Sequence, residues 1–107
     1  MIYHWCSEDD WRAASDSYEA ASLAEEGFIH FSFRDQVERT ATTLERGKLN
    51  LVLLCVDETG LEIVLEDSYG GGEEFPHIYG PIPAAAVVRV FPFPPEADGS
   101  FLLPEGV

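Results

Sequence analysis

The pattern of apolar and polar positions is clearest in the middle of the chain. Residues 49–56, apolar except for Asn50, form a run bounded by turn residues, which predicts a buried central strand. After a turn over residues 57–60, Leu61, Ile63 and Leu65 alternate with Glu62, Val64 and Glu66. This alternation predicts a half-buried strand whose acidic side chains, Glu66 included, face solvent.

The strongest helical pattern lies over residues 34–47. Val37, Ala41 and Leu44 recur at steps of four and three residues, and Gly47 supplies a stop. Because these apolar residues share one face of a helix, we expect that face to pack on the core.

Shorter elements are predicted on both sides of this helix. Ser7 is placed as an N-cap for a helix over about residues 8–15, and Gly27 closes one helical turn over residues 23–27. Further strands are predicted over residues 1–5, 28–32 and 87–91, and loops over residues 16–22 and 67–74.

Together these elements predict one α+β domain covering residues 1–107. Strands and helices interleave without the regular rhythm of a doubly wound sheet. Four prolines from Pro92 onward predict a C-terminal tail without regular strand pairing. No internal repeat or second-domain boundary is visible.

The charge of the chain argues against nucleic acid as a partner. Twenty acidic residues against six basic ones give a formal net charge of −14. Phosphate binding needs clustered Lys and Arg, whereas the six bases here are scattered. The simplest explanation of the acidic excess is a solvated surface.

The remaining composition is that of an ordinary intracellular globular protein. Only Cys6 and Cys55 are present, without a Cys-x-x-Cys pair, and no apolar run reaches about 18 residues. We therefore expect a soluble, reduced, cytoplasmic protein with no membrane association. The sequence predicts nothing about its oligomeric state.

The candidate chemistry lies in three histidines, each next to apolar or aromatic residues. His4 and His30 fall in predicted strands, and His77 lies in the proline- and glycine-restricted segment 73–82. A histidine in such a setting is commonly a core residue satisfied by hydrogen bonds. Neighbouring strands run about 5 Å apart, so same-face histidines can also converge on one cleft.

Other kinds of site are less well supported by the sequence. Metal is not expected, because His4, Cys6, His30 and His77 lack the short-range spacing of common zinc ligands. Neither Ser32 nor Cys6 lies in a nucleophile-elbow pattern. The triple glycine at residues 70–72 is flanked by carboxylates and predicts a flexible turn, not a phosphate-binding loop.

Several segments together resemble the family called domain of unknown function 952, found in short bacterial proteins. The resemblance runs the full length and is carried by Ile2-Tyr3-His4 and by residues 27–32, 51–54, 75–82 and 92–99. It implies a fold similar to that of ADP-ribosyltransferases, with a small split or mixed β-sheet flanked by helices around an NAD cleft.

The resemblance also implies roles for individual residues. His4 corresponds to the first-strand residue that holds a ribose hydroxyl, and His30 to the second-strand residue beside the nicotinamide. The third element is the transferring glutamate, which stabilises positive charge on the ribose carbon. His77, Glu73 or Glu74 stands in its place, and none is a clean match.

Two function classes follow from these observations. In the first, a cleft binds, and acts on, a nucleotide-like small molecule of the NAD or ADP-ribose type. Its catalytic candidates are His4, His30 and His77, and its ligand-binding candidates are Ser32, Tyr79 and Tyr3. In the second, the histidines are structural and the protein is a non-catalytic binding or interaction module.

Overall fold

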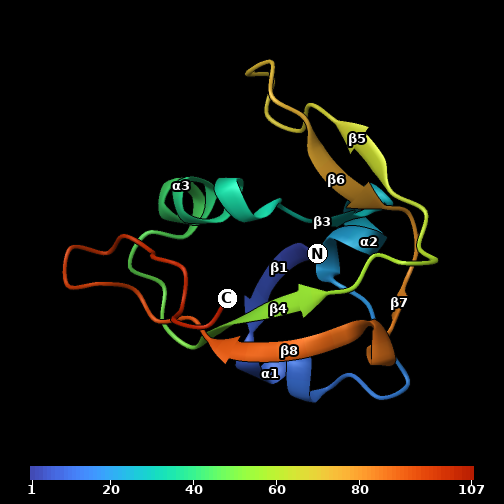
Figure 1. Ribbon diagram of the computed structural model, residues 1–107, viewed down its shortest axis with the longest axis horizontal. Coiled ribbons are helices and arrows are strands. Elements are labelled where there is room, and N and C mark those ends of the chain that lie inside the picture. Colours follow the sequence, from blue (N-terminus) through green and yellow to red (C-terminus); the bar gives the residue numbers. More distant parts are fainter.

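The fold is built around the apolar strand in the middle of the chain. In the computed structural model, which describes residues 1–107, β4 (Leu51–Val56) is buried at all six positions. It lies between β1 (Ile2–Ser7) and β8 (Val87–Pro92) in a three-stranded antiparallel sheet. The predicted central strand is thus confirmed, and Figure 1 shows it between its two neighbours.

Two smaller sheets complete the β-structure. In one, β6 (Phe75–Ile78) lies between β3 (Ile29–His30) and β5 (Val64–Glu66). The other pairs β2 (Ser17–Tyr18) with β7 (Ile82–Pro83). A bridge between Tyr3 and Ser32, with backbone hydrogen bonds of 2.9 and 2.8 Å, joins the first two sheets.

The helices are few and short. They are α1 (Glu8–Arg12), α2 (Ala21–Glu26), α3 (Arg34–Glu45) and the 3₁₀ turn η1 (Ala84–Ala86). The Ser7 hydroxyl accepts from the Asp10 amide as the predicted N-cap, and Gly27 ends α2 with φ +88°. None of these helices has the length and apolar character needed to span a bilayer.

The core is divided in two because consecutive residues of β1 and β4 point to opposite faces of their sheet. Ile2, Val52 and Leu54 pack on one face with residues of the smaller sheets and form the first core. Tyr3 and Leu53 pack on the other face under α3 and form the second core. The histidine-containing strands therefore adjoin the first core.

Three predictions about the secondary structure are corrected by the structure. All strand pairings are antiparallel, so the predicted mixed sheet is wrong. The alternation over residues 61–66 is also wrong, because Leu65 is 48% exposed while Glu66 turns toward β6. The predicted helix over residues 8–15 ends at Arg12.

The C-terminal segment is packed, although it lacks regular pairing. Phe93 and Phe101 are 0% and 1% exposed in the second core, with ring centroids 4.9 Å apart. Gly99 adopts φ +86°, and a Cβ there would lie 2.9 Å from the Arg46 side chain. The tail thus follows the end of α3 closely.

Truncating Phe101 should therefore destabilise the whole protein. We expect Phe101→Ala to lower the free energy of unfolding by about 3–5 kcal/mol, because it opens a cavity in a closed core. Urea denaturation followed by circular dichroism measures this. The adjacent Leu102 is 53% exposed, so Leu102→Ala is the matched control and should change stability by about 0.5 kcal/mol or less. Equal small effects of both variants would contradict a docked tail.

Candidate functional site

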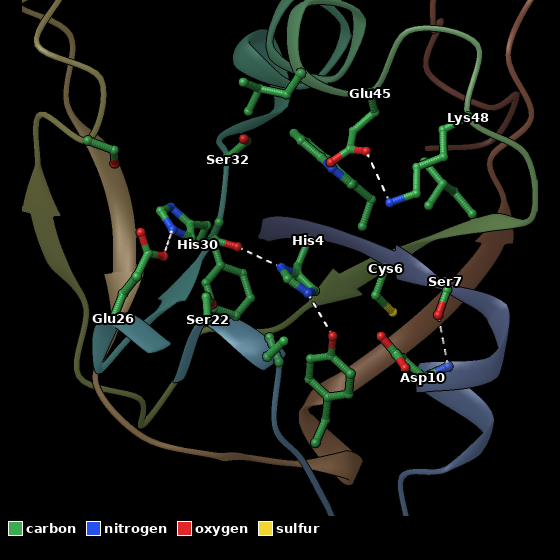
Figure 2. Close-up of a pocket in the computed structure, with 18 of the residues that line it drawn as sticks. His4, Cys6, Ser7, Asp10, Ser22, Glu26, His30, Ser32, Glu45 and Lys48 are labelled. Carbon is green, nitrogen blue, oxygen red and sulfur yellow. Dashed lines mark hydrogen bonds and ion pairs between the residues drawn. The ribbon is translucent and has the colours of Figure 1, made fainter. Parts of the chain in front are cut away.

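An open cleft of about 650 Å³ lies at the junction of the sheets and α2. Its walls come from β1, β3, α2, the end of α3 and the loop after β5. The lining residues central to its chemistry are His4, Glu26, His30, Ser32, Ser68 and Tyr69. Figure 2 shows His4 and His30 side by side in this cleft.

His4 is held entirely by the protein. Its Nδ1–H donates to the His30 carbonyl over 2.6 Å, so the neutral ring accepts at Nε2 from the Tyr18 hydroxyl over 2.8 Å. Burial lowers the pKa of His4 to about 4, against the raising effect of the hydrogen bond to His30. His4 is therefore neutral near pH 7 and has no free ring nitrogen.

Cys6 and Tyr18 form the floor beside His4. Burial is the main cause that raises the pKa of the Cys6 thiol and that of the Tyr18 hydroxyl, and each group also contacts the other. Both groups therefore stay protonated at neutral pH. Neither is an activated nucleophile.

His30 differs from His4 in having unmet bonding capacity. Its Nε2–H donates to the Glu26 carboxylate over 2.6 Å, while its Nδ1 is buried and has no partner in the protein. The ring lies edge-on to Phe28 at 4.8 Å and nearly parallel to Tyr69, with centroids 6.3 Å apart. Since its side chain is 31% exposed, His30 is the histidine open to a ligand.

His77 lies behind the cleft wall and is 2% exposed. Its ring stacks on Phe28 with centroids 4.1 Å apart. The Nδ1–H donates to Glu66 over 2.8 Å, because a carboxylate can only accept. Nε2 therefore accepts, and the Ser68 hydroxyl donates to it over 2.5 Å.

The carboxylate of Glu66 is shared between two donors. Besides His77, the Tyr79 hydroxyl donates to the same oxygen. The hydrogen bonds from Tyr79 and then from His77 lower the pKa of Glu66 below its ordinary value. Glu66 is thus ionised at neutral pH and holds the ring of His77 in one tautomer.

The structure brings the three histidines together but separates other predicted site residues. The rings of His30 and His77 lie edge to face with centroids 5.2 Å apart. His4, His30 and Ser32 line the cleft, whereas His77 reaches it only through Ser68.

The predicted ligand contacts of Tyr3 and Tyr79 do not fit the geometry of the cleft. Tyr3 neighbours His4 along β1, so its side chain points to the opposite face and packs in the second core. Tyr79 is 53% exposed and bonds Glu66 outside the cleft. Neither side chain lines it.

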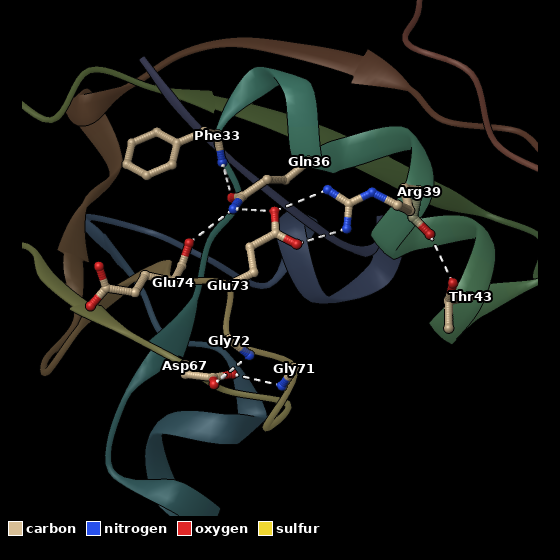
Figure 3. Close-up of polar contacts among 9 residues, drawn as sticks. All are labelled: Phe33, Gln36, Arg39, Thr43, Asp67, Gly71, Gly72, Glu73 and Glu74. Carbon is tan, nitrogen blue, oxygen red and sulfur yellow. Dashed lines mark hydrogen bonds and ion pairs between the residues drawn. The ribbon is translucent and has the colours of Figure 1, made fainter.

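Of the alternative carboxylates, Glu73 is occupied elsewhere, while Glu74 is bound only through its backbone carbonyl. Glu73 accepts from both guanidinium nitrogens of Arg39, at 2.8 and 2.9 Å, and from the Gln36 amide at 2.9 Å. These contacts, Arg39 first, lower the pKa of Glu73 to about 2. Gln36 also accepts from the Phe33 amide and donates to the Glu74 carbonyl, as Figure 3 shows.

This network fixes the glycine loop between β5 and β6. At its other end, the Asp67 carboxylate accepts from the amides of Gly71 and Gly72 at 3.2 and 2.8 Å. The loop that carries Ser68 and Tyr69 is therefore held at both ends. The turn predicted to be flexible at the three glycines is held by hydrogen bonds from the Gly71 and Gly72 amides to Asp67.

Glu26, Glu66 and Ser68 are the residues that sequence reasoning missed. Glu66 was assigned to the solvent face by the alternation of Leu61, Ile63 and Leu65. Glu26 approaches His30 only because Gly27 reverses the chain between them. No local motif marks Ser68, since its role depends on the pairing of β5 with β6.

The charged lining of the cleft is mainly acidic. Asp10, Glu26 and Glu45 face it, and Lys48, the one cation there, lies 3.4 Å from the Glu45 carboxylate. No group of three or more His, Cys, Asp or Glu side chains is arranged to hold a metal ion. The cleft therefore offers carboxylates and imidazole to a ligand, with little net positive charge.

These features define a small α+β protein with an open cleft, whose lining includes His4 and His30. The chain belongs to the family described as "Protein of unknown function (DUF952)", whose model matches residues 5–90. No curated protein matches it.

The chain is also similar to solved structures of protein CC0527 from Caulobacter crescentus. The X-ray crystal structure is 37% identical with a TM-score of 0.85, over 95% of this chain and 93% of that one. The solution NMR structure is 35% identical with a TM-score of 0.75, over 92% and 89% of the two chains. The fold is thus shared with an experimentally determined relative.

The buried neutral His4 predicts a specific loss of stability in acid. The unfolded chain binds a proton at His4 near pH 6.5, whereas the folded protein does so only near pH 4. Between these values the unfolded state holds more protons, so stability falls as the pH is lowered. We expect this group alone to cost about 2 kcal/mol between pH 6.5 and 5.

Urea unfolding at a series of pH values measures that loss, and NMR titration of the His4 ring assigns it. The depressed carboxylates, such as Glu73, act mainly below their ordinary pKa of 4.5, outside this window. A His4 ring that titrates near 6.5 would contradict the assignment.

Proposed function

We propose that the cleft binds a small molecule carrying a flat, hydrogen-bonding ring of the nicotinamide or nucleoside type. The observation that carries this proposal is the unpartnered Nδ1 of His30. Buried polar atoms are generally hydrogen-bonded, so an exception calls for an explanation, and a ligand that supplies the missing partner is one. His4 and His77 have no such deficit.

The surroundings of His30 suit a ring. The Tyr69 ring lies nearly parallel to the His30 imidazole and is 48% exposed, so a flat ligand can stack on the exposed face of Tyr69. Phe28 closes the inner side edge-on. Because Nε2–H donates to Glu26, Nδ1 accepts, and a carboxamide or exocyclic amino N–H of the ligand then completes its bonding.

The charge of the lining selects among such molecules. Three carboxylates and one paired lysine repel a pyrophosphate, whose negative charge would lie in this cleft without a cationic partner. An uncharged nucleoside or a cationic nicotinamide riboside suits the same lining better. NAD and ADP-ribose are weaker candidates on this ground.

Glu26 supplies the carboxylate that a transferase-like reaction needs. It is bonded to His30, so it stands beside a ring held there, whereas Glu73 is bound by Arg39. A carboxylate at that place stabilises positive charge developing on a ribose carbon. An ADP-ribosyltransferase-like arrangement in this protein would therefore use Glu26 where the resemblance seen in the sequence points to His77, Glu73 or Glu74.

A protein-interaction module is the second candidate, and one surface feature favours it. β8 is an edge strand, and Val88 and Val90 on it are 46% and 38% exposed. Edge strands with exposed apolar side chains can pair with an extended peptide. This surface lies apart from the histidines and is compatible with a cleft that binds a small molecule.

A thermal-shift series tests the proposed ligand class. We expect nicotinamide riboside or adenosine to raise the melting temperature, and NAD and ADP-ribose to raise it less at equal concentration. A ligand at a hundred times its dissociation constant adds about 2.7 kcal/mol, which is about 10 °C or more for a domain of this size. No shift with any of the four compounds would contradict the proposal.

The matched variant is His30→Phe, which keeps a ring but removes both nitrogens. It should abolish the shift while leaving the circular dichroism spectrum unchanged, because His30 lies partly exposed in a two-residue strand. Glu62→Gln, an exposed position outside the cleft, is the control and should shift like the wild type. A shift that survives in His30→Phe would place the ligand elsewhere.

A further inference from the structure

The hydrogen bonds behind the cleft wall form a serine–histidine–carboxylate chain. Ser68 Oγ lies 2.5 Å from His77 Nε2, and His77 Nδ1 lies 2.8 Å from Glu66 Oε1. Because the carboxylate fixes the proton on Nδ1, Nε2 carries a lone pair directed at the hydroxyl. This is the tautomer and the order of groups that a general base needs to activate a serine.

The fold holds these three groups without a sequence motif. In the pairing of β5 with β6, Val64 lies opposite His77, so Glu66 lies diagonally from it on the same face. Ser68 follows two residues later, where the chain leaves β5. The Tyr79 hydroxyl, one residue after β6, donates to the same oxygen of Glu66 and helps to hold it in place.

The members of this hydrogen-bonded triad differ in solvent exposure, as catalysis requires. His77 is 2% exposed and covered by Phe28, so water does not compete for its nitrogens. Ser68, by contrast, lines the cleft. Ser68 therefore borders a space of about 650 Å³ while the base behind it is shielded.

Free backbone donors lie beside the serine. The amides of Gly71 and Gly72 are bonded to Asp67, whereas those of Tyr69 and Gly70 donate no hydrogen bond within the protein. The loop is pinned by these Asp67 contacts and by the network at Glu73. Fixed amides next to a nucleophile are the usual donors to a developing oxyanion.

We propose that Ser68 is the nucleophile of an acyl-transfer site in which His77 is the general base and Glu66 orients it. The substrates are small carboxylic esters that enter the cleft. Its lining of aromatic rings and carboxylates favours an uncharged or cationic ester over an anionic one. This inference goes beyond ring binding at His30 and does not depend on it.

The reaction balances with water as the only co-reactant. Ser68 Oγ attacks the ester carbonyl carbon as its proton passes to His77 Nε2, and the tetrahedral intermediate expels the alcohol, which takes that proton. Water then gives a proton to Nε2 and adds as hydroxide to the acyl-serine. The carboxylic acid leaves as the proton returns to Ser68 Oγ. Glu66 stabilises the imidazolium in both halves.

Two measurements on the purified protein test the assignment. One is hydrolysis of 4-nitrophenyl acetate, and the other is labelling by a fluorophosphonate probe, with the modified residue found by mass spectrometry. We expect one adduct per chain, on Ser68, and kcat/KM at least 100-fold lower in Ser68→Ala. Ser15→Ala, an exposed serine outside the cleft, is the control and should match the wild type.

Glu66 is a positioning residue, and its role has a separate readout. In Glu66→Gln the imidazolium loses its anionic partner, so the acid limb of the pH–kcat/KM profile should move to lower pH while kcat/KM falls at least tenfold. A residue that only supports the fold would lower activity without moving that limb. Circular dichroism checks that each variant is folded.

Three results would overturn the proposal: no adduct, an adduct at another residue, or ester hydrolysis that Ser68→Ala leaves unchanged. In each case the Ser68 hydroxyl serves to satisfy His77 and nothing more. The outcome is separable from that of ring binding, because His30→Phe leaves the Ser68–His77–Glu66 chain in place. A thermal shift without any adduct would sustain the first function and reject this one.

Discussion

The pairing of β6 with two neighbours at once determines what chemistry this fold can carry. One side of β6 sets His77 opposite His30, and the other sets it opposite Val64 and diagonal to Glu66. A slip of one residue in either pairing would turn His77 to the opposite face and dissolve both contacts. The buried ends of the strand, Phe75 and Ile78, oppose such a slip because their own burial depends on the same register.

Within that register, the three histidines have three different environments, and hydrogen bonding distinguishes them. His4 has both nitrogens satisfied by protein groups and is neutral through burial, so it acts as a structural member of the wall. Both ring nitrogens of His77 also have hydrogen-bond partners, but one partner is the hydroxyl of Ser68, a residue that lines the cleft. His30 alone keeps an unpartnered nitrogen. Their shared residue type therefore says less about function than the neighbours of each ring.

Local signals in the sequence located most of the elements. The apolar run at β4, the periodicity of α3 and the caps at Ser7 and Gly27 depend on neighbours within a few residues, and the structure confirms them. The alternation of side chains along a strand adds a further constraint. Tyr3 and His4 are consecutive in β1, so they could not both face one cleft.

The site itself was less accessible from the sequence because it arises from pairings distant along the chain. The alternation of Leu61, Ile63 and Leu65 places Glu66 outside, yet β5 begins only at Val64 and its pairing partner decides the facing. A tertiary contact thus overrides a local pattern of three residues. Ser68 likewise gains its role from His77, nine residues later, and Glu26 from His30, four residues later. In each case a turn lies between the two partners, and the sequence marks it only by glycine or bend-forming residues.

The acidic charge acts on both proposed activities through the same shortage of free cations. Three of the six bases are paired with carboxylates, namely Arg12 with Glu8, Arg39 with Glu73 and Lys48 with Glu45. The other three, Arg34, Arg46 and Arg89, each donate to a backbone carbonyl in the C-terminal segment. Since the one base that lines the cleft, Lys48, is paired with Glu45, the lining favours a neutral or positively charged ligand over an anion. This constraint weighs against phosphate-bearing partners of every size, and it leaves imidazole, hydroxyl and carboxylate groups as the chemistry with which the cleft can act.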